Sequence, residues 1–178
     1  MHDRSRQVRI RDAVPTEFDL ISALMMRAND QYADMATNPA WRSYLEDAAD
    51  VAGHAVTLTV NVAERSGSLV GSVGYSAPLA APEGKQSLPA AWAVIRSLAV
   101  DPSARGRGIG RALALECLAR ARRDGAATVG LTTHERMSVA KSMYEHMGFV
   151  RAPSYDYFPD EEVHVIAYRL DLSLTVGE

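Results

Sequence analysis

The chain has 178 residues, of which 47% are hydrophobic and 23% charged, and its formal net charge is −3. This composition is typical of a globular protein. The length favours one domain, residues 1–178, whose core needs neither disulfides nor a structural metal. A protein that binds nucleic acid through its whole surface would be basic overall, so DNA or RNA is not the expected partner.

The cysteine content and the apolar runs bear on where the protein works. The single cysteine, Cys117, excludes an intrachain disulfide and fits a reducing compartment. The first residues carry charge but no apolar segment typical of a secretory signal. No apolar run reaches the roughly 18 residues that a transmembrane helix needs. We therefore expect a cytoplasmic protein that does not contact a membrane.

The first half of the chain predicts a strand, two helices and a hairpin. In the first predicted helix, apolar residues recur at helical spacing after Thr16, a candidate N-cap. A loop rich in proline follows the hairpin, and we expect it to cover the acceptor or to lie at a homodimer contact. The predicted strand covers 8–15, the helices 16–30 and 40–51, the hairpin 56–76 and the loop 77–90.

The second half alternates between strands and helices. Near its end, Gly148 has the place of a left-handed residue after a helix, with Phe149 packing back on that helix. The strands are predicted at 91–100, 126–133 and 163–172, with a further candidate at 149–152, and the helices at 109–123 and 138–149. This order predicts an α+β or α/β fold in which helices flank a mixed sheet.

The charge is unevenly distributed along the chain. Residues 96–123 contain seven arginines and two acidic residues, a net charge of +5, so the remainder carries −8. A basic segment in an acidic chain indicates one localised anionic ligand. We expect Arg120, Arg122 and Arg123 to solvate a helix end. Arg105 and Arg107 are the better candidates for the anion.

Three alternating glycines stand between the strand at 91–100 and the helix at 109–123. Glycine lets the backbone approach an anion and adopt positive φ angles. The first turn of a helix presents free N–H groups and the positive end of its dipole. The segment from Arg105 to Gly110 therefore predicts a seat for a pyrophosphate group, with the arginines as additional donors.

Other phosphate-binding patterns do not fit this turn. The dinucleotide fingerprint needs G-x-G-x-x-G, and a P-loop needs G-K-[ST] after its glycines. Here the glycines are at 106, 108 and 110, and Arg111-Ala112 follows them. An RNA-binding basic segment would be repetitive and disordered, whereas this turn is single and flanked by apolar runs.

The pattern R-x-x-G-x-G after "LAVDP" resembles the GNAT superfamily of N-acetyltransferases. A second element agrees, because "SVAKSMYEHMGF" is similar to a later helix of that family ending A-x-x-x-Y-x-x-x-G-F. The matching residues are Ala140, Tyr144, Gly148 and Phe149. The resemblance implies the GNAT fold, with a mixed, mostly antiparallel twisted sheet. It also implies acetyl-CoA as cofactor, and acetyl transfer to a primary amine of a small molecule or a protein.

The resemblance also implies roles for individual residues. Main-chain N–H groups at the end of the strand would polarise the thioester carbonyl, the glycine turn would hold the pyrophosphate, and Tyr144 would be the general acid. The residues expected to bind the cofactor are Leu98, Ala99, Val100, Arg105, Gly106, Arg107, Gly108, Ile109, Gly110, Arg111, Met137 and Lys141.

Two positions depart from the family pattern. Many relatives carry a glutamate as general base where this chain has Val94, and an asparagine for the pantetheine arm where it has Met137. His134 and Glu135 are candidate bases by location; a water chain or an amine that arrives neutral are alternatives. The departures also keep open a GNAT-fold acyl-CoA sensor without turnover.

The acceptor site has two candidate clusters. Residues 155–162 are aromatic and acidic, and Trp41 and Tyr44 lie on one predicted helix. Acidic residues beside aromatic rings suit a cationic amine. A solvated loop and a packed helix face explain the same residues without any ligand.

Overall fold

The computed structural model describes residues 7–78 and 88–175. The chain divides into two compact units, one made of Met1–Tyr75 and Ser97–Cys117 and the other of Ser76–Arg96 and Leu118–Glu178. Strand β4 (Ala93–Val100) and helix α4 (Ile109–Arg123) each run from one unit into the other. The two units are described in turn.

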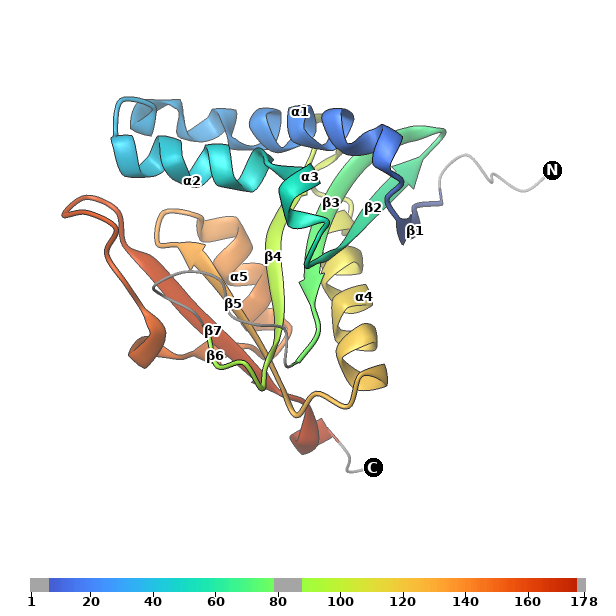
Figure 1. Ribbon diagram of the computed structural model, residues 1–178, viewed down its shortest axis with the longest axis vertical. Coiled ribbons are helices and arrows are strands. Elements are labelled where there is room, and N and C mark those ends of the chain that lie inside the picture. Colours follow the sequence, from blue (N-terminus) through green and yellow to red (C-terminus); the bar gives the residue numbers. More distant parts are fainter. Residues whose placement is uncertain (1–6, 79–87, 176–178) are drawn as a thin grey trace. The chain divides into compact units, whose positions relative to one another are not determined.

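The first unit combines three helices with an antiparallel sheet. Strand β1 pairs with β2, and β2 pairs with β3. Helices α1 and α2 run antiparallel to each other (Figure 1). The elements are β1 (Arg9–Asp12), α1 (Phe18–Asn29), α2 (Pro39–Ala49), α3 (Val51–His54), β2 (Thr59–Arg65) and β3 (Ser68–Ser76).

The core of the first unit lies between α1 and one face of this sheet. Ile21, Leu24 and Met25 from α1 are buried in one cluster with Val62 of β2 and Ala99 of β4. Alternate residues of a strand point to opposite faces, so residues of β2 and β3 in between face the other way. On that second face, a Cβ on Gly71 would come within 2.9 Å of Leu113 and 3.1 Å of Ile109. Glycine at this position therefore lets α4 approach the sheet closely.

A two-residue turn joins β2 to β3. Ser66 and Gly67 both have positive φ angles, 52° and 78°. Two left-handed residues in succession match the twist of the flanking strands, as in type I′ hairpins. The predicted hairpin is confirmed, and its turn is at the "RSGS" segment that predicted it.

The second unit contains the remaining strands. β5 runs antiparallel to β7, from Thr128 opposite Asp171 to His134 opposite Val165. The first half of β4 is parallel to β5, with Ala93–Ile95 beside Val129–Leu131. The new elements are β5 (Thr128–His134), α5 (Ser138–His146), β6 (Val150–Arg151) and β7 (Val165–Asp171). The strand order of the sheet is β1-β2-β3-β4-β5-β7-β6, so the predicted mixed, mostly antiparallel sheet is confirmed.

Helix α5 ends as its sequence predicts. Gly148 has φ 95°. The Phe149 N–H donates to the Tyr144 carbonyl at 3.0 Å, and the Gly148 N–H to that of Glu145 at 3.0 Å. The rings of Phe149 and Tyr144 meet edge to face, 5.5 Å apart. These two bonds and the apolar contact make a Schellman cap, so Tyr144 stabilises the end of its own helix.

The structure contains one helix that the sequence did not predict. The short helix α3 was not predicted, because the predicted helix at 40–51 ends on its first residue, Val51, and no element was predicted at 52–55. Most of the predicted 77–90 loop, residues 79–87, lies outside the described residues. Within the part of the chain that is described, no helix is long and apolar enough to cross a membrane.

Candidate active site

The glycine turn follows a fixed end of β4. The Asp101 carboxylate accepts hydrogen bonds from the Ser103 hydroxyl at 2.7 Å and the Ser103 N–H at 3.0 Å. It also pairs with Arg27 of α1 at 3.0 Å. The Ser103 hydroxyl, the Ser103 N–H and then Arg27 lower the pKa of Asp101. A carboxylate held this way caps the 3₁₀ turn Pro102–Ala104 and fixes the chain before the glycines.

The turn itself is open and left-handed at two points. Gly106 and Gly108 have φ angles of 73° and 74°. A Cβ at either residue would meet nothing within 4 Å, and both residues are exposed. The main chain is therefore accessible from outside, in a conformation that other residues adopt only with strain.

Helix α4 begins directly after this turn. Its first helical bond runs from the Ala112 N–H to the Gly108 carbonyl at 2.9 Å. The N–H groups of Ile109, Gly110 and Arg111 therefore have no acceptor within the helix. These groups and the helix dipole favour an anion at this end. The turn fits a diphosphate, because Gly106 and Gly108 are exposed and a Cβ at either residue would meet nothing within 4 Å.

The arginines of the turn differ in their contacts. The Arg105 guanidinium donates to the Ala28 carbonyl in α1 at 2.6 Å. This bond ties the turn to the end of α1. Arg107 and Arg111 are exposed, so their charges are available to a ligand in solution.

The strand residues predicted to act through their backbone lie in the last part of β4. Ala99 is buried, whereas Leu98 and Val100 are half-buried. Ser97, directly before them, has a positive φ of 51°. A non-glycine residue in the left-handed region inside a strand is uncommon and interrupts its regular geometry.

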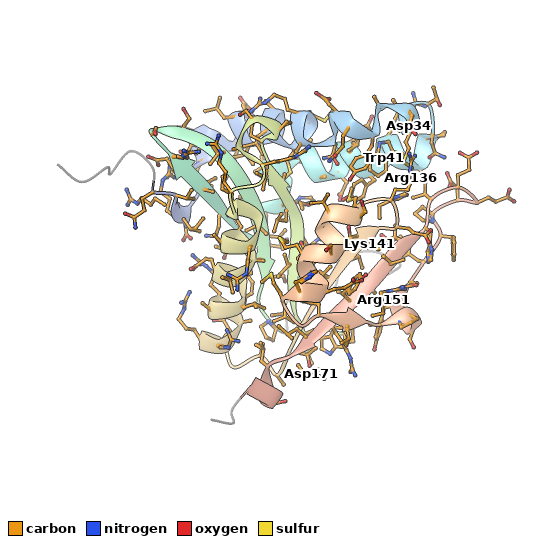
Figure 2. All side chains as sticks on the ribbon, turned by 180° about the vertical axis from the view of Figure 1, so that it is seen from behind. Asp34, Trp41, Arg136, Lys141, Arg151 and Asp171 are labelled. Atoms are coloured by element: carbon orange, nitrogen blue, oxygen red, sulfur yellow. The ribbon has the colours of Figure 1, made fainter. Side chains whose placement is uncertain are left out.

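The predicted residues of the second unit gather around α5. Tyr144 is 5% exposed. Met137 precedes the helix, and its sulfur accepts a hydrogen bond from the Thr133 hydroxyl at 3.4 Å. The Lys141 ammonium donates to the Glu135 carbonyl at 3.2 Å; Figure 2 marks this lysine on α5. Val94, which stands where many relatives carry a glutamate, lies in β4 opposite Gly130.

Both candidate bases, His134 and Glu135, make contacts with other residues of the protein. His134 is 3% exposed, and its Nδ1 accepts the Arg136 N–H at 3.0 Å. Burial, followed by the positive charge of Arg136, lowers the pKa of His134. A neutral imidazole that accepts at Nδ1 carries its proton on Nε2, so it is a poor base. The Glu135 carboxylate lies 3.2 Å from Nδ1 of His164.

His164 has more contacts than a histidine at the edge of a strand usually has. Its Nε2 lies 3.3 Å from the Asp156 carboxylate, and its ring stacks on Phe158 with centroids 4.2 Å apart. Asp156 also pairs with Arg151 and accepts the Ala167 N–H. No sequence signal links these residues; the register of β5 with β7 brings Glu135 and His164 together.

The two candidate acceptor clusters have different environments. Trp41 is 1% exposed, with Tyr44 stacked on it at 5.2 Å and Tyr32 edge-on at 5.5 Å. It is a packing residue of α2 (Figure 2). In the other cluster, Phe158 is 62% exposed.

The comparisons with known proteins agree with this geometry. Residues 21–149 match the Acetyltransferase (GNAT) family. The chain belongs to this family of acetyltransferases.

One curated relative is similar over part of its length. A mycothiol acetyltransferase of Cellulomonas flavigena is 41% identical over 96 residues, which cover 51% of this chain and 26% of the relative. The chain thus matches about a quarter of that protein.

Solved structures share the fold. The PaiA N-acetyltransferase of Thermoplasma acidophilum, solved with coenzyme A, has a TM-score of 0.69 at 16% identity, covering 92% of this chain and 99% of its own. A Salmonella typhimurium protein solved with its cofactor acetyl-CoA has a TM-score of 0.63 at 15% identity, covering 96% of each chain. The predicted GNAT fold is confirmed.

Proposed function

We propose that the protein is an N-acetyltransferase that transfers the acetyl group of acetyl-CoA to a primary amine of a small molecule or a protein. The observation that carries the proposal is the turn Arg105–Gly110, where exposed glycines with positive φ lead into α4. The cofactors in the two solved relatives support acetyl-CoA as the donor. We treat residues 1–178 as one acetyltransferase domain.

The residues divide the work between binding and chemistry. The amides between Gly106 and Arg111 bind the diphosphate, and Arg107 and Arg111 add charge. Arg105 holds the turn in place through Ala28. Met137 and Lys141 contact the cofactor from the start of α5. Bound acetyl-CoA supplies the activated acyl group.

The acyl transfer needs charge stabilisation and a proton. N–H groups of Leu98, Ala99 and Val100 stabilise the negative charge that develops on the thioester oxygen. The amine nitrogen bonds to the carbonyl carbon while the carbon–sulfur bond breaks. Tyr144 gives its proton to the departing thiolate, since an ordinary phenol is protonated at neutral pH. The amine proton leaves to water, because His134 and Glu135 are engaged in other contacts. The Tyr144 phenolate then takes a proton from water, which restores the general acid.

Two further properties in this proposal are the location of the protein and its oligomeric state. The one thiol, Cys117, is buried, which suits the cytoplasmic location that we expect. Leu115 is 39% exposed and leaves a homodimer contact on α4 open, whereas Leu118 is 4% exposed and packs within the chain.

A specific observation favours a second function, an acyl-CoA sensor without turnover. Val94 cannot accept a proton, and the Met137 sulfur already accepts the Thr133 hydroxyl. Such a protein would bind acetyl-CoA and leave it intact.

The test is to incubate the protein with acetyl-CoA and a panel of primary amines and to follow the release of thiol. Thiol release that depends on an amine supports the transferase. Saturable binding of acetyl-CoA without thiol release over the whole panel supports the sensor. If coenzyme A neither binds nor raises the melting temperature, both functions are excluded.

A further inference from the structure

An aromatic ring is exposed in the loop between the 3₁₀ turn Pro153–Tyr155 and β7. This loop projects beyond the start of β7 (Figure 1). Phe158 in the loop is 62% exposed, and its ring stacks on the His164 imidazole with planes 10° apart. Since one face of the ring lies on the imidazole, the opposite face accounts for the exposure. The loop therefore presents a flat apolar surface to solvent.

The imidazole beneath this ring is held from two sides. Nδ1 of His164 lies 3.2 Å from the Glu135 carboxylate, and Nε2 lies 3.3 Å from the Asp156 carboxylate. Asp156 is itself anchored, because it pairs with Arg151 and accepts the Ala167 N–H at 2.8 Å. A ring supported in this way keeps its orientation, so a ligand need not order it on binding.

The charges around the ring are mostly negative. Residues 155–162 contain four acidic residues and no lysine or arginine. With Glu135, the adjoining Arg136 and Arg151, the group has five acidic and two basic side chains, a net charge of −3. Glu135 and Glu161 are exposed. The charge of a ligand complementary to this surface is therefore positive.

An exposed phenyl ring beside carboxylates fits a guanidinium group better than an ammonium group. The guanidinium is planar and more weakly hydrated, and it stacks on aromatic faces. The Glu135 side chain, 59% exposed at the edge of the Phe158–His164 stack, attracts a cation bound at the ring. Guanidinium groups occur in proteins as arginine side chains, so a protein segment is the ligand that supplies one.

This surface adjoins the part of the second unit that we assign to the cofactor. Glu135 follows β5 directly, and its carbonyl accepts a hydrogen bond from the Lys141 ammonium at 3.2 Å. Lys141 is one of the two residues at the start of α5 that contact the cofactor in the proposed function. A peptide held at Phe158 therefore lies on the side of the β5 end where the acetyl group is delivered.

We propose that Phe158, stacked on His164 and flanked by carboxylates, binds an arginine side chain of the acceptor, and that the acceptor amine belongs to a basic protein segment. The proposal rests on the proposed function, whose acceptor it narrows from amines in general to amines of arginine-containing segments. Small polyamines, which have no guanidinium group, are not the preferred acceptors.

The test uses peptides of one length with a free amino terminus. They differ in whether the side chains next to the terminus are arginine, lysine or citrulline, which is an uncharged analogue of arginine. Each peptide is titrated by calorimetry into the protein saturated with coenzyme A, and thiol release from acetyl-CoA is measured in parallel. We expect the arginine peptide to bind at least about fivefold more tightly than the citrulline peptide. The difference should shrink as the salt concentration rises.

Two substitutions of Phe158 test the aromatic face. Phe158→Tyr keeps the face and should bind the arginine peptide as the wild type does. Phe158→Leu keeps an apolar side chain without the face, so it should weaken the arginine peptide about three- to tenfold and the citrulline peptide less. Val150→Ala, at a second exposed apolar residue of this unit, is the matched control and should change neither affinity.

A third substitution tests the charge. Glu135→Gln should weaken the arginine and lysine peptides about two- to fivefold and leave the citrulline peptide unchanged. Glu46→Gln makes the same change at an exposed residue of α2, in the first unit. It should leave all three affinities as they are.

The outcomes separate this inference from the proposed function. Arginine-dependent binding that Phe158→Leu weakens, without thiol release from any amine, upholds the surface and overturns turnover. Thiol release combined with equal affinities for the arginine and citrulline peptides, or with spermidine preferred to the arginine peptide, upholds the transferase and overturns the surface. Phe158→Leu indistinguishable from Val150→Ala also overturns it. If Phe158→Leu does not fold, the contrast between arginine and citrulline in the wild type decides alone.

Discussion

The glycine turn before α4 and the end of β5 both carry polar groups, but they satisfy them in opposite ways. The turn presents main-chain amides outward, and its glycines leave the approach open. At the end of β5, His134 is buried against the Arg136 N–H, and Glu135 lies against His164. The turn is therefore prepared for an external anion, whereas the β5 end is stabilised by its own contacts. Binding at the first region and protein stability at the second should respond differently to substitution.

The largest expected effect concerns Tyr144, the one side chain that we assign to chemistry. Tyr144→Phe removes the phenol proton but keeps the ring that packs on Phe149. We expect kcat to fall by about one to three orders of magnitude and coenzyme A affinity to stay nearly intact. Steady-state kinetics and isothermal titration measure the two quantities.

A second tyrosine provides the control for that substitution. Tyr168 is 1% exposed, and its hydroxyl donates to the Glu145 carboxylate at 2.7 Å. Tyr168→Phe should cost about 1 kcal/mol of stability with kcat unchanged. Equal turnover in wild type and Tyr144→Phe would remove Tyr144 from the mechanism and leave it a helix-capping residue.

The next effect tests whether the glycine turn binds through its main chain. Gly108→Ala places a Cβ on the exposed face and strains a residue with φ 74°. We expect the Kd of coenzyme A to rise about 10- to 100-fold, since the amides shift and the approach narrows. Isothermal titration measures the change.

Gly67 is a matched control for Gly108. It has φ 78°, and a Cβ there would also meet nothing within 4 Å, but it lies in the β2–β3 hairpin. Gly67→Ala and Gly108→Ala should each destabilise the protein by about 1 kcal/mol. If both variants bind coenzyme A equally well, the turn is not the diphosphate site.

A smaller effect separates the two arginines of the turn. Arg107 is exposed, so Arg107→Gln should weaken coenzyme A binding about three- to tenfold and make that binding less sensitive to salt. Arg105→Gln should instead lower the melting temperature, because it removes the bond to the Ala28 carbonyl. Its binding should keep the salt dependence of the wild type. The opposite pattern would make Arg105 the phosphate ligand and Arg107 a solvated side chain.

The difference between the glycine turn and the end of β5 also explains which features of the structure can be predicted from the sequence. The glycine turn depends on neighbours in the chain: two glycines with positive φ, an aspartate cap at Asp101, and a helix that begins at Ile109. Such local preferences are visible in a sequence. The cap at Gly148 was predicted for the same reason.

The contacts of the side chains are not local, and the sequence does not predict them. Arg105 meets the Ala28 carbonyl 77 residues away. His164 meets Glu135 through a strand register that shifts every partner if it slips by one residue. The buried Ser72, whose hydroxyl has no hydrogen-bond partner among the described residues, has no signature in the sequence either, because its burial depends on which face of β3 lies beneath α1.

The smallest expected effect is a pH dependence of stability that comes from the β5 end. The pKa of His134 is lowered in the folded protein, mainly by burial. The unfolded chain therefore binds a proton below about pH 6.5 where the folded chain resists it. The free energy of unfolding should fall as the pH falls through that range, by at most about 1.4 kcal/mol per pH unit. His134→Asn keeps a hydrogen-bond acceptor for the Arg136 N–H but cannot titrate, so its urea-unfolding free energy should change less between about pH 5 and pH 8. Identical slopes for the two proteins would mean that His134 is protonated without cost, and the β5 end would then be as open to solvent as the glycine turn.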